Sequence, residues 1–191
     1  MKRIILAIAF VFVAFTSFSQ TWVSDPAHSR LGFSISHLTI SNITGNFKQF
    51  EVTVVSSKAD HSDATVEVTA QVASINTDVE ARDNHLKSAD FFDVQQFPTL
   101  KFKSTSLTKI KGNSYKLTGN LTLHGITRPV NLDVVLNGTV TNPMNKKETT
   151  GFSIKGILKR SEFNIGGKFP EAMVGDEVTL IASAELSPAT K

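Results

Sequence analysis

Apolar and polar residues alternate with a period of two along most of this chain. In the segment 64–74, for example, Val66, Val68, Ala70 and Val72 alternate with more polar residues. Successive side chains of a β-strand point to opposite faces, so this alternation predicts strands with one apolar face. The segments that carry the pattern are 30–38, 46–55, 64–74, 99–104, 115–125, 129–138, 151–160 and 177–186. The chain is therefore predicted to be an all-β protein.

The connections between these segments carry residues typical of turns. The stretches "LHGITRP" (123–129) and "NGTVTNPMN" (137–145) contain the Gly, Pro and Asn that tight turns favour. Eight antiparallel strands can close into a barrel, which removes exposed sheet edges and leaves an interior for side chains or one small ligand. A two-sheet sandwich is the structural alternative. The length of the strands favours an eight-stranded antiparallel barrel.

One stretch, "EARDNHLKSADFFDVQQFP" (80–98), interrupts the alternation. Thr77 and Glu80 before it fit a capping box, in which a hydroxyl and a carboxylate bind the free amides of a helix start. The sequence therefore predicts a short helix over about 78–87, inserted between two strands. A helix cannot pair within the sheet, so we expect it across an end of the barrel or along its outside.

The N-terminus has the composition of a secretory signal peptide. Two cationic residues precede an apolar run from 4 to 15, which is shorter than the ~20 residues that span a bilayer. We expect a signal peptide over residues 1–19, cleavage after Ser19, and a periplasmic or secreted protein; an uncleaved anchor is the alternative. Cleavage removes two of the 20 cationic residues and none of the 17 anionic ones, so most of the net positive charge of the chain belongs to the signal peptide. A nucleic-acid partner is therefore not expected.

The expected mature chain, residues 20–191, shows no repeat and no break in composition that would mark a second domain. We therefore expect a single β-barrel domain. The chain contains no cysteine, so disulfides cannot support it and no lipid can be attached through a cysteine thiol. Its stability is expected to come from the hydrophobic core.

Four segments carry a resemblance to a known family. They are "DPAHSRLGFSISHL" (25–38), "GNF" (45–47), "ARDNHLKSADFFDVQQFPTLKFKS" (81–104) and "LTGNLTLHGITRPV" (117–130). In this order, and over nearly the whole mature chain, they resemble the YceI-like proteins. The resemblance implies a lipocalin-like antiparallel barrel that binds a polyisoprenoid or another long-chain amphiphile, and it points to homodimers. In "KRSEFNIGG" (159–167), Glu162 and Asn164 replace the Asp and Gly that are usual in the family, which raises a question about the conformation of this last loop.

Motifs that would indicate catalysis or a cofactor are absent from the sequence. It has no G-x-S-x-G nucleophile elbow, no P-loop and no dinucleotide fingerprint. The histidines His28, His37, His61, His85 and His124 are scattered, with no pair at the spacing of metal ligands. We therefore expect no enzyme activity, no metal and no cofactor.

The apolar face of the strands predicts an apolar interior. Small residues such as Gly119, Ala70 and Ala184 lie among the long Phe side chains of this face, which favours a cavity for a chain-shaped guest over a solid core. The residues that we expect to contact the tail of such a lipid are Phe33, Ile35, Phe50, Val68, Phe91, Phe92, Phe102, Leu121, Phe152 and Leu180. Phe91 and Phe92 follow the predicted helix, so we expect them to cover the apolar end of the cavity.

Four polar residues are candidates for contact with a head group: His37, Arg82, Asp83 and His85. His37 lies on the same face of its strand as Leu31, so its side chain is expected to point into the barrel. There it would be either a hydrogen-bonded core histidine or a contact with the ligand. For Arg82, Asp83 and His85 the alternative is an internal ion pair that holds the helix to a loop.

The leading hypothesis is a protein that sequesters or carries a long-chain isoprenoid-like or fatty-acid-like lipid without chemical reaction. One alternative is a metal protein or histidine-dependent enzyme, which a spatial cluster of His37, His85 and His124 would favour. The other is a plugged barrel that acts through surface contacts, which a solid interior would favour.

Overall fold

The computed structural model describes residues 19–58 and 62–189, most of them in antiparallel strands. The strands are β1 Gln20–Ser24, β2 Arg30–His37, β3 Ser41–Phe47, β4 Phe50–Ser56, β5 Thr65–Gln71, β6 Ile75–Asn76, β7 Thr99–Lys111, β8 Ser114–Leu123, β9 Ile126–Thr141, β10 Glu148–Lys159 and β11 Val174–Pro188. The helices are the 3₁₀ turns η1 Val72–Ser74 and η2 Arg160–Phe163 and the α-helix α1 Glu80–Lys87. The prediction of an all-β fold with one short inserted helix is confirmed. The predicted signal peptide lies outside the described residues except for Ser19.

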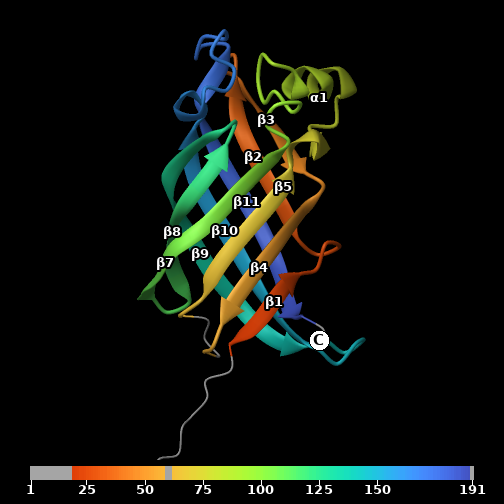
Figure 1. Cartoon of the computed structure of the whole chain (residues 1–191), viewed down its shortest axis with the longest axis vertical. Coiled ribbons are helices and arrows are strands. Elements are labelled where there is room, and N and C mark those ends of the chain that lie inside the picture. The colour runs from red at the N-terminus through yellow and green to blue at the C-terminus, as the bar shows by residue number, and fades with distance from the viewer. Residues whose placement is uncertain (1–18, 59–61, 190–191) are drawn as a thin grey trace, which may run out of the picture.

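The strands form a closed, eight-stranded antiparallel barrel (Figure 1). Hydrogen-bonded neighbours follow the order β1-β4-β5-β7-β8-β9-β10-β11, and β11 also pairs with β1, which closes the ring. Strands β2, β3 and β6 extend the wall beyond β1, β4 and β5, toward the end where α1 lies. The predicted barrel is confirmed, and the two-sheet sandwich is not the architecture of this chain.

Three strands of the barrel are each interrupted and consist of two segments: β1 with β2, β3 with β4, and β5 with β6. Pro26 lies in the break between β1 and β2, where a residue without an N–H group cannot donate to the ladder. Residues 48–49 separate β3 from β4, and η1 separates β5 from β6. The sequence pattern did not predict β1, whose five residues are too few to show an alternation.

The cross-strand register places the predicted apolar positions opposite one another. Phe33 pairs with Leu180, and Phe102 lies between Val68 on β5 and Leu121 on β8. From the sequence we expected the small residue Gly119 to leave room for a guest. The structure shows that it does not. A Cβ atom there would lie 2.4 Å from the ring of Phe102, so this glycine makes room for that ring instead.

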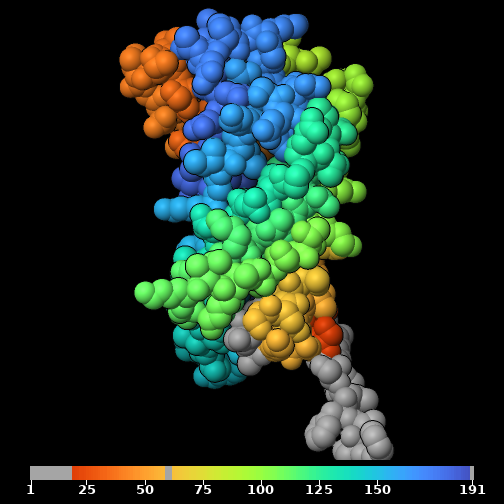
Figure 2. All heavy atoms as spheres, turned by 90° about the vertical axis from the view of Figure 1, so that its left-hand side faces the viewer, coloured from red at the N-terminus to blue at the C-terminus, as the bar shows by residue number. Residues whose placement is uncertain are grey.

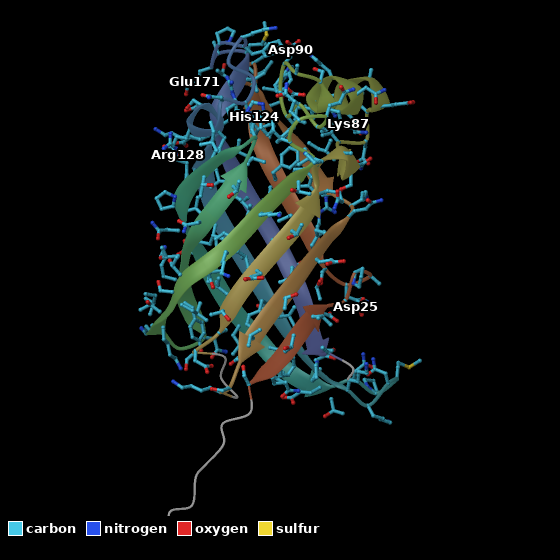
Figure 3. All side chains as sticks on the ribbon, viewed as in Figure 1. Asp25, Lys87, Asp90, His124, Arg128 and Glu171 are labelled. Atoms are coloured by element: carbon cyan, nitrogen blue, oxygen red, sulfur yellow. The ribbon has the colours of Figure 1, made fainter. Side chains whose placement is uncertain are left out.

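One end of the barrel carries α1, the β2–β3 hairpin and the segment from η2 to β11. Figure 2 shows the β2–β3 hairpin, in orange, beside this last segment, in blue, and the backbone N–H of Leu38 donates to the carbonyl of Met173 between them. The labelled charged side chains Lys87, Asp90 and Glu171 lie at the same end in Figure 3, whereas Asp25 lies toward the other end. Segments far apart in the sequence therefore meet around one end of the barrel.

Candidate functional site

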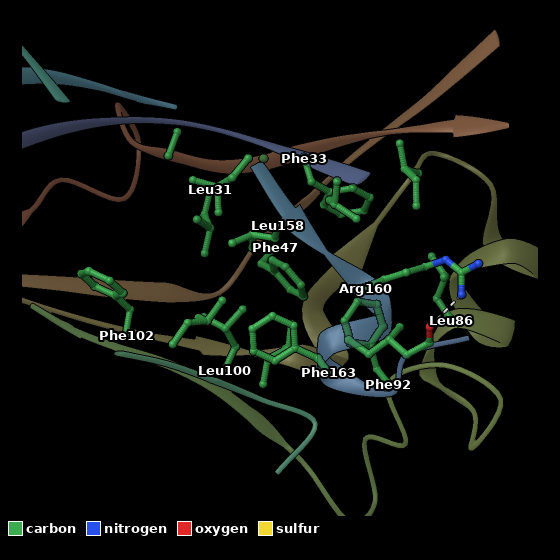
Figure 4. A pocket seen from close by; sticks show the side chains of 18 of the residues that line it. Leu31, Phe33, Phe47, Leu86, Phe92, Leu100, Phe102, Leu158, Arg160 and Phe163 are labelled. Atoms are coloured by element: carbon green, nitrogen blue, oxygen red, sulfur yellow. Dashed lines mark hydrogen bonds between the residues drawn. The ribbon is translucent and has the colours of Figure 1, made fainter. Parts of the chain in front are cut away.

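The barrel contains a cavity of about 410 Å³. Its wall is formed mainly by apolar side chains that point inward from the strands, and Figure 4 shows Leu31 and Phe102 toward one end and Leu86 and Arg160 at the other. This volume falls within the ~300–1,000 Å³ of typical ligand pockets. The described interior is therefore hollow rather than fully packed.

The floor of the cavity is a tightly packed cluster at the β1 end of the barrel. Trp22, Val54, Ala64 and Leu186 are buried there against Ala184 and do not line the cavity, whereas Ala184 does. Trp22 retains only 5% of its exposed surface. Large side chains therefore fill the barrel below the cavity and block that end.

The other end of the cavity reaches the molecular surface beside α1. Two residues of its wall at this end are well exposed: Met173, at 44% of its full surface, and His85, whose side chain is 49% exposed. The cavity thus has one packed end and one end with access to solvent.

The residues predicted to contact a lipid tail line this cavity with one exception. Phe33, Ile35, Phe50, Val68, Phe91, Phe92, Phe102, Leu121 and Leu180 belong to the wall. Phe152 does not, so its predicted place in the cavity wall is wrong. It pairs with Ala184 and packs against the floor cluster, because its position on β10 lies at the level where the barrel is already filled.

Part of the wall was missed by the sequence analysis. Phe163, Ile165, Phe169 and Met173 reach the cavity from η2 and the loop that follows it, and Phe47 reaches it from β3. Loop residues have no period of two, so no alternation marked them. The phenylalanine and isoleucine content of the loop was the only available signal.

Phe91 and Phe92 occupy different environments although both line the cavity. The ring of Phe91 is 8% exposed and stacks on Phe169 with 4.8 Å between ring centroids. Phe92 is half-buried and meets Phe47 edge-on at 6.1 Å. Gly166, at φ +64°, allows close contact, since a Cβ atom there would lie 2.8 Å from the Phe91 ring. Phe91 is therefore part of the core as well as the cavity wall.

The predicted capping box is wrong. The residue before the first turn of α1 is Val79, and no side chain caps this helix start. Thr77 instead donates its backbone N–H and its hydroxyl to Asp83, at 2.8 and 2.5 Å. Asp78, at φ +63°, turns the chain between them, so the Asp83 carboxylate takes the role that the sequence gave to Glu80.

Arg82 and Asp83 do not form the ion pair considered from the sequence. Arg82 donates from Nε to the Thr77 hydroxyl at 2.7 Å and from Nη2 to the Thr77 carbonyl at 2.8 Å. Both charged side chains thus bind the same threonine. Arg82, Thr77 and His85 line the cavity, together with His37 from the end of β2. Asp83 does not line it but faces a separate surface hollow, so its predicted contact with a head group is not supported by its position.

His85 joins the helix to the segment that follows it. Its Nε2 lies 3.3 Å from Oδ2 of Asp90, and the other carboxylate oxygen of Asp90 accepts a hydrogen bond of 2.6 Å from Lys168. The Lys168 ammonium, and then the His85 ring, lower the pKa of the Asp90 carboxyl below its ordinary value. The helix segment and the loop after η2 are therefore connected by an ion pair as well as by the Phe91–Phe169 stack.

Arg160 holds that loop in place. The side chain is 8% exposed and donates all five of its N–H groups to backbone carbonyls. The acceptors are Ile165, Gly166, Phe169, Val174 and Gly175, at 2.6 to 3.1 Å. The loop between η2 and β11 is therefore wrapped around one guanidinium group, which also lines the cavity.

The residues that replace the usual Asp and Gly, Glu162 and Asn164, both suit their positions in the loop. Asn164 follows η2 in the left-handed region, at φ 56° and ψ 31°. Glycine adopts this conformation without strain, and asparagine tolerates it better than most residues do. Glu162 is exposed.

Asp176 fixes the start of η2. It accepts hydrogen bonds of 2.9 Å from the backbone N–H and the hydroxyl of Ser161. Burial by itself would raise the pKa of Asp176, but these hydrogen bonds and the nearby charge of Arg160 bring it below its ordinary value.

The histidines of the described residues do not gather into a metal site. His37 and His85 line the cavity, but His124 is not part of the wall. The Nδ1 atom of His124 lies 3.0 Å from the carbonyl oxygen of Phe163. Within residues 19–58 and 62–189, no group of three His, Cys, Asp or Glu residues could hold a metal ion. His61 lies outside the described residues.

A family profile described as a YceI-like domain matches residues 22–186. This chain belongs to the YceI-like family. A UPF0312 protein of Staphylococcus aureus strain N315 is 40% identical over 169 residues, which cover 85% of this chain and 95% of the relative. The resemblance inferred from the sequence segments is confirmed.

Solved structures of three other proteins share the barrel. BcnA of Burkholderia cenocepacia superposes with a TM-score of 0.77 at 26% identity, covering 87% of this chain and 99% of BcnA. A YceI protein of Campylobacter jejuni gives 0.73 at 32% identity over 82% and 91%. A polyisoprenoid-binding domain of Saccharophagus degradans gives 0.63 at 12% identity over 89% and 99%, which shows a common fold.

The described helices of this YceI-like chain are all short. None of them, within residues 19–58 and 62–189, has the length and apolar character of a membrane-spanning helix.

Proposed function

We propose that this chain binds a long-chain apolar lipid, of the isoprenoid or fatty-acyl kind, in the barrel cavity. The observation that carries the proposal is the cavity itself, about 410 Å³ in volume, packed shut at one end and lined almost throughout by Phe, Leu, Ile and Val. The proposed role is to sequester or carry the lipid without reacting with it. The polyisoprenoid-binding description of the Saccharophagus degradans domain, which has the same fold, supports this ligand class.

The energetics of such a site need few specific contacts. Each buried methylene contributes ~0.8 kcal/mol, so about ten carbons supply roughly 8 kcal/mol before the cost of association. A ligand of this kind is held by wall area and shape rather than by a motif. This explains why the sequence carries no sharp binding signature beyond its family segments.

Native mass spectrometry of protein purified without detergent tests the proposal. We expect part of the population to carry an added mass of a few hundred daltons, and solvent extraction of the same sample to yield a long-chain lipid. The delipidated protein should then bind a fluorescent apolar probe, and the extracted lipid should displace this probe. A protein that carries no lipid and binds neither probe nor lipid would contradict the proposal. The same spectra report whether the chain is a homodimer.

The proposed location is the periplasm or the extracellular medium. The signal-like N-terminus supports it, with cleavage after Ser19. Intact-mass analysis of protein expressed with its full N-terminus and recovered from cell fractions tests this. A mature chain that begins at Gln20 in the periplasmic or secreted fraction is the expected result, and a full-length chain in the cytoplasm would overturn it.

A further inference from the structure

The charged side chains that line the cavity all carry the same sign. They are Arg160, which is buried, Arg82, which is half-buried, and Arg30 and Lys159, which are both exposed, and no Asp or Glu of the described residues belongs to the wall. Arg160 is buried because it binds five backbone carbonyls, but an apolar ligand alone gives no reason for the half-buried Arg82, because burying a charge away from water costs free energy. The distribution of charge therefore carries information about the ligand beyond its apolar tail.

The carboxylates near this end of the barrel are engaged elsewhere. Asp83 accepts from Thr77, Asp176 accepts from Ser161, and Asp90 accepts from Lys168. Among the described residues, no Asp or Glu forms an ion pair with Arg82 or Arg160. The charges of Arg82 and Arg160 are thus only partly balanced, through intervening hydroxyl and backbone groups.

Arg160 contributes charge rather than hydrogen bonds to a ligand. It is 8% exposed, and its five donors are all taken by backbone carbonyls of the loop after η2 and of the start of β11. Its positive charge is therefore fixed in the wall, where the low polarity of the surroundings lets it act on a ligand more strongly than it would in water.

Arg82 can donate directly to a ligand. Its Nε and Nη2 bind Thr77, which fixes the orientation of the guanidinium plane, while Nη1 makes no hydrogen bond to any described residue. The side chain is half-buried and lines the cavity from α1, the same end at which the exposed residue His85 reaches the surface. A preoriented cationic donor at the open end of an apolar cavity matches an anionic group on the end of a chain.

We infer that the ligand is an amphiphile with an anionic head group, a carboxylate or a phosphate, bound at the α1 end against Arg82 and within the positive potential of Arg160. The tail extends from there toward the floor cluster. This inference rests on the proposed function, since it assigns the head group of the same ligand. A neutral head group would gain only part of this interaction, and a cationic one would be repelled.

Competition between ligands with one tail and different head groups tests the inference. Delipidated full-length mature protein is loaded with a fluorescent naphthylamine probe. The probe is then displaced by one of four ligands: hexadecanoate, hexadecyl phosphate, hexadecanol or hexadecylamine. The titrations are made at slightly alkaline pH and below the micelle concentration of each ligand. We expect at least one of the two anions to bind about tenfold more tightly than the alcohol, the size of one charge-assisted hydrogen bond. The comparison of carboxylate with phosphate identifies which anion the site prefers.

Substitution of Arg82 locates the effect. In Arg82→Gln, the ratio of anion to alcohol affinity should fall toward one while the alcohol affinity changes less than about twofold. Lys87→Gln is the matched control, because Lys87 lies on the same helix but lines the separate surface hollow rather than the cavity. Arg82→Lys keeps the charge and should retain part of the preference, which separates loss of charge from loss of folding.

The outcomes distinguish this inference from the function on which it rests. If the alcohol or the amine binds the unsubstituted protein as tightly as both anions do, the anionic head group is wrong and lipid binding stands. If none of the four ligands displaces the probe, the proposed function and this inference fall together. An anion preference that Arg82→Gln leaves unchanged would place the head group away from Arg82 and overturn the assignment.

Discussion

At the scale of single residues, Arg160 shows how one buried side chain outside the strands holds a whole loop. Its five hydrogen bonds organise the loop from 164 to 173 and the start of β11, and lysine at this position could satisfy at most three of the five carbonyls. Each buried carbonyl left without a donor costs about 1–3 kcal/mol, so the loss of two donors in Arg160→Lys should lower the free energy of unfolding by about 2–6 kcal/mol. Urea denaturation measures this, with the exposed Lys155→Gln on β10 as control. An unchanged midpoint would mean that water replaces the lost donors at no cost.

The adjacent Phe91 and Phe92 provide a second prediction at this scale. Phe91 is a core residue stacked on Phe169, so Phe91→Ala should cost about 3–5 kcal/mol of stability. Phe92 is half-buried in the cavity wall, so Phe92→Ala should cost clearly less in the empty protein and weaken lipid retention more. Unfolding of the delipidated variants and probe displacement measure the two effects. Equal losses of stability, with normal ligand affinity in both folded variants, would show that both residues are simply core.

At the scale of elements, the segment that follows α1 and the loop after η2 are held together by the ion pair of Asp90 and Lys168. The pKa of Asp90 is lowered in the folded protein, so its contribution to stability is present above the ordinary Asp value of ~3.9 and is lost as the pH falls through the lower folded value. We therefore expect a modest difference in thermal midpoint between Asp90→Asn and the parent protein at pH 6 that becomes smaller as the pH is lowered below the ordinary Asp value. Glu171→Gln, in the same loop, should show no such pH dependence. A difference that persists in acid would argue against the ion pair.

The elements also show what the sequence could predict. Period-two alternation located the long strands because each has one face toward the interior and one toward solvent, which is a purely local signal. The start of α1 was misplaced because the expected capping box of Thr77 and Glu80 does not form. Asp78 instead adopts a left-handed conformation, and Thr77 donates its hydroxyl to Asp83. The loop side chains of the cavity wall, such as Phe169, are positioned by Arg160 across a long loop. No local pattern encodes that placement.

At the scale of the whole molecule, the barrel is expected to be independent of metal. Neither the sequence spacing nor the described residues offer a set of metal ligands. Addition of a strong chelator should therefore leave both the thermal midpoint and the binding of an apolar probe unchanged, with a calcium- or zinc-dependent protein as a positive control for the chelator. A large fall in the midpoint would show that the histidines have been misread.

The packed floor around Trp22 has a consequence for the kinetics of exchange. A tunnel open at both ends would let a chain slide through, whereas a blind one requires the tail to go in first and the head to come out first. Each further methylene that reaches new wall should slow release about fourfold, following its ~0.8 kcal/mol of burial. Once the tail touches the floor, longer chains gain nothing. The depth of the barrel would then act as a molecular ruler, and the residence time of a bound lipid would record its length.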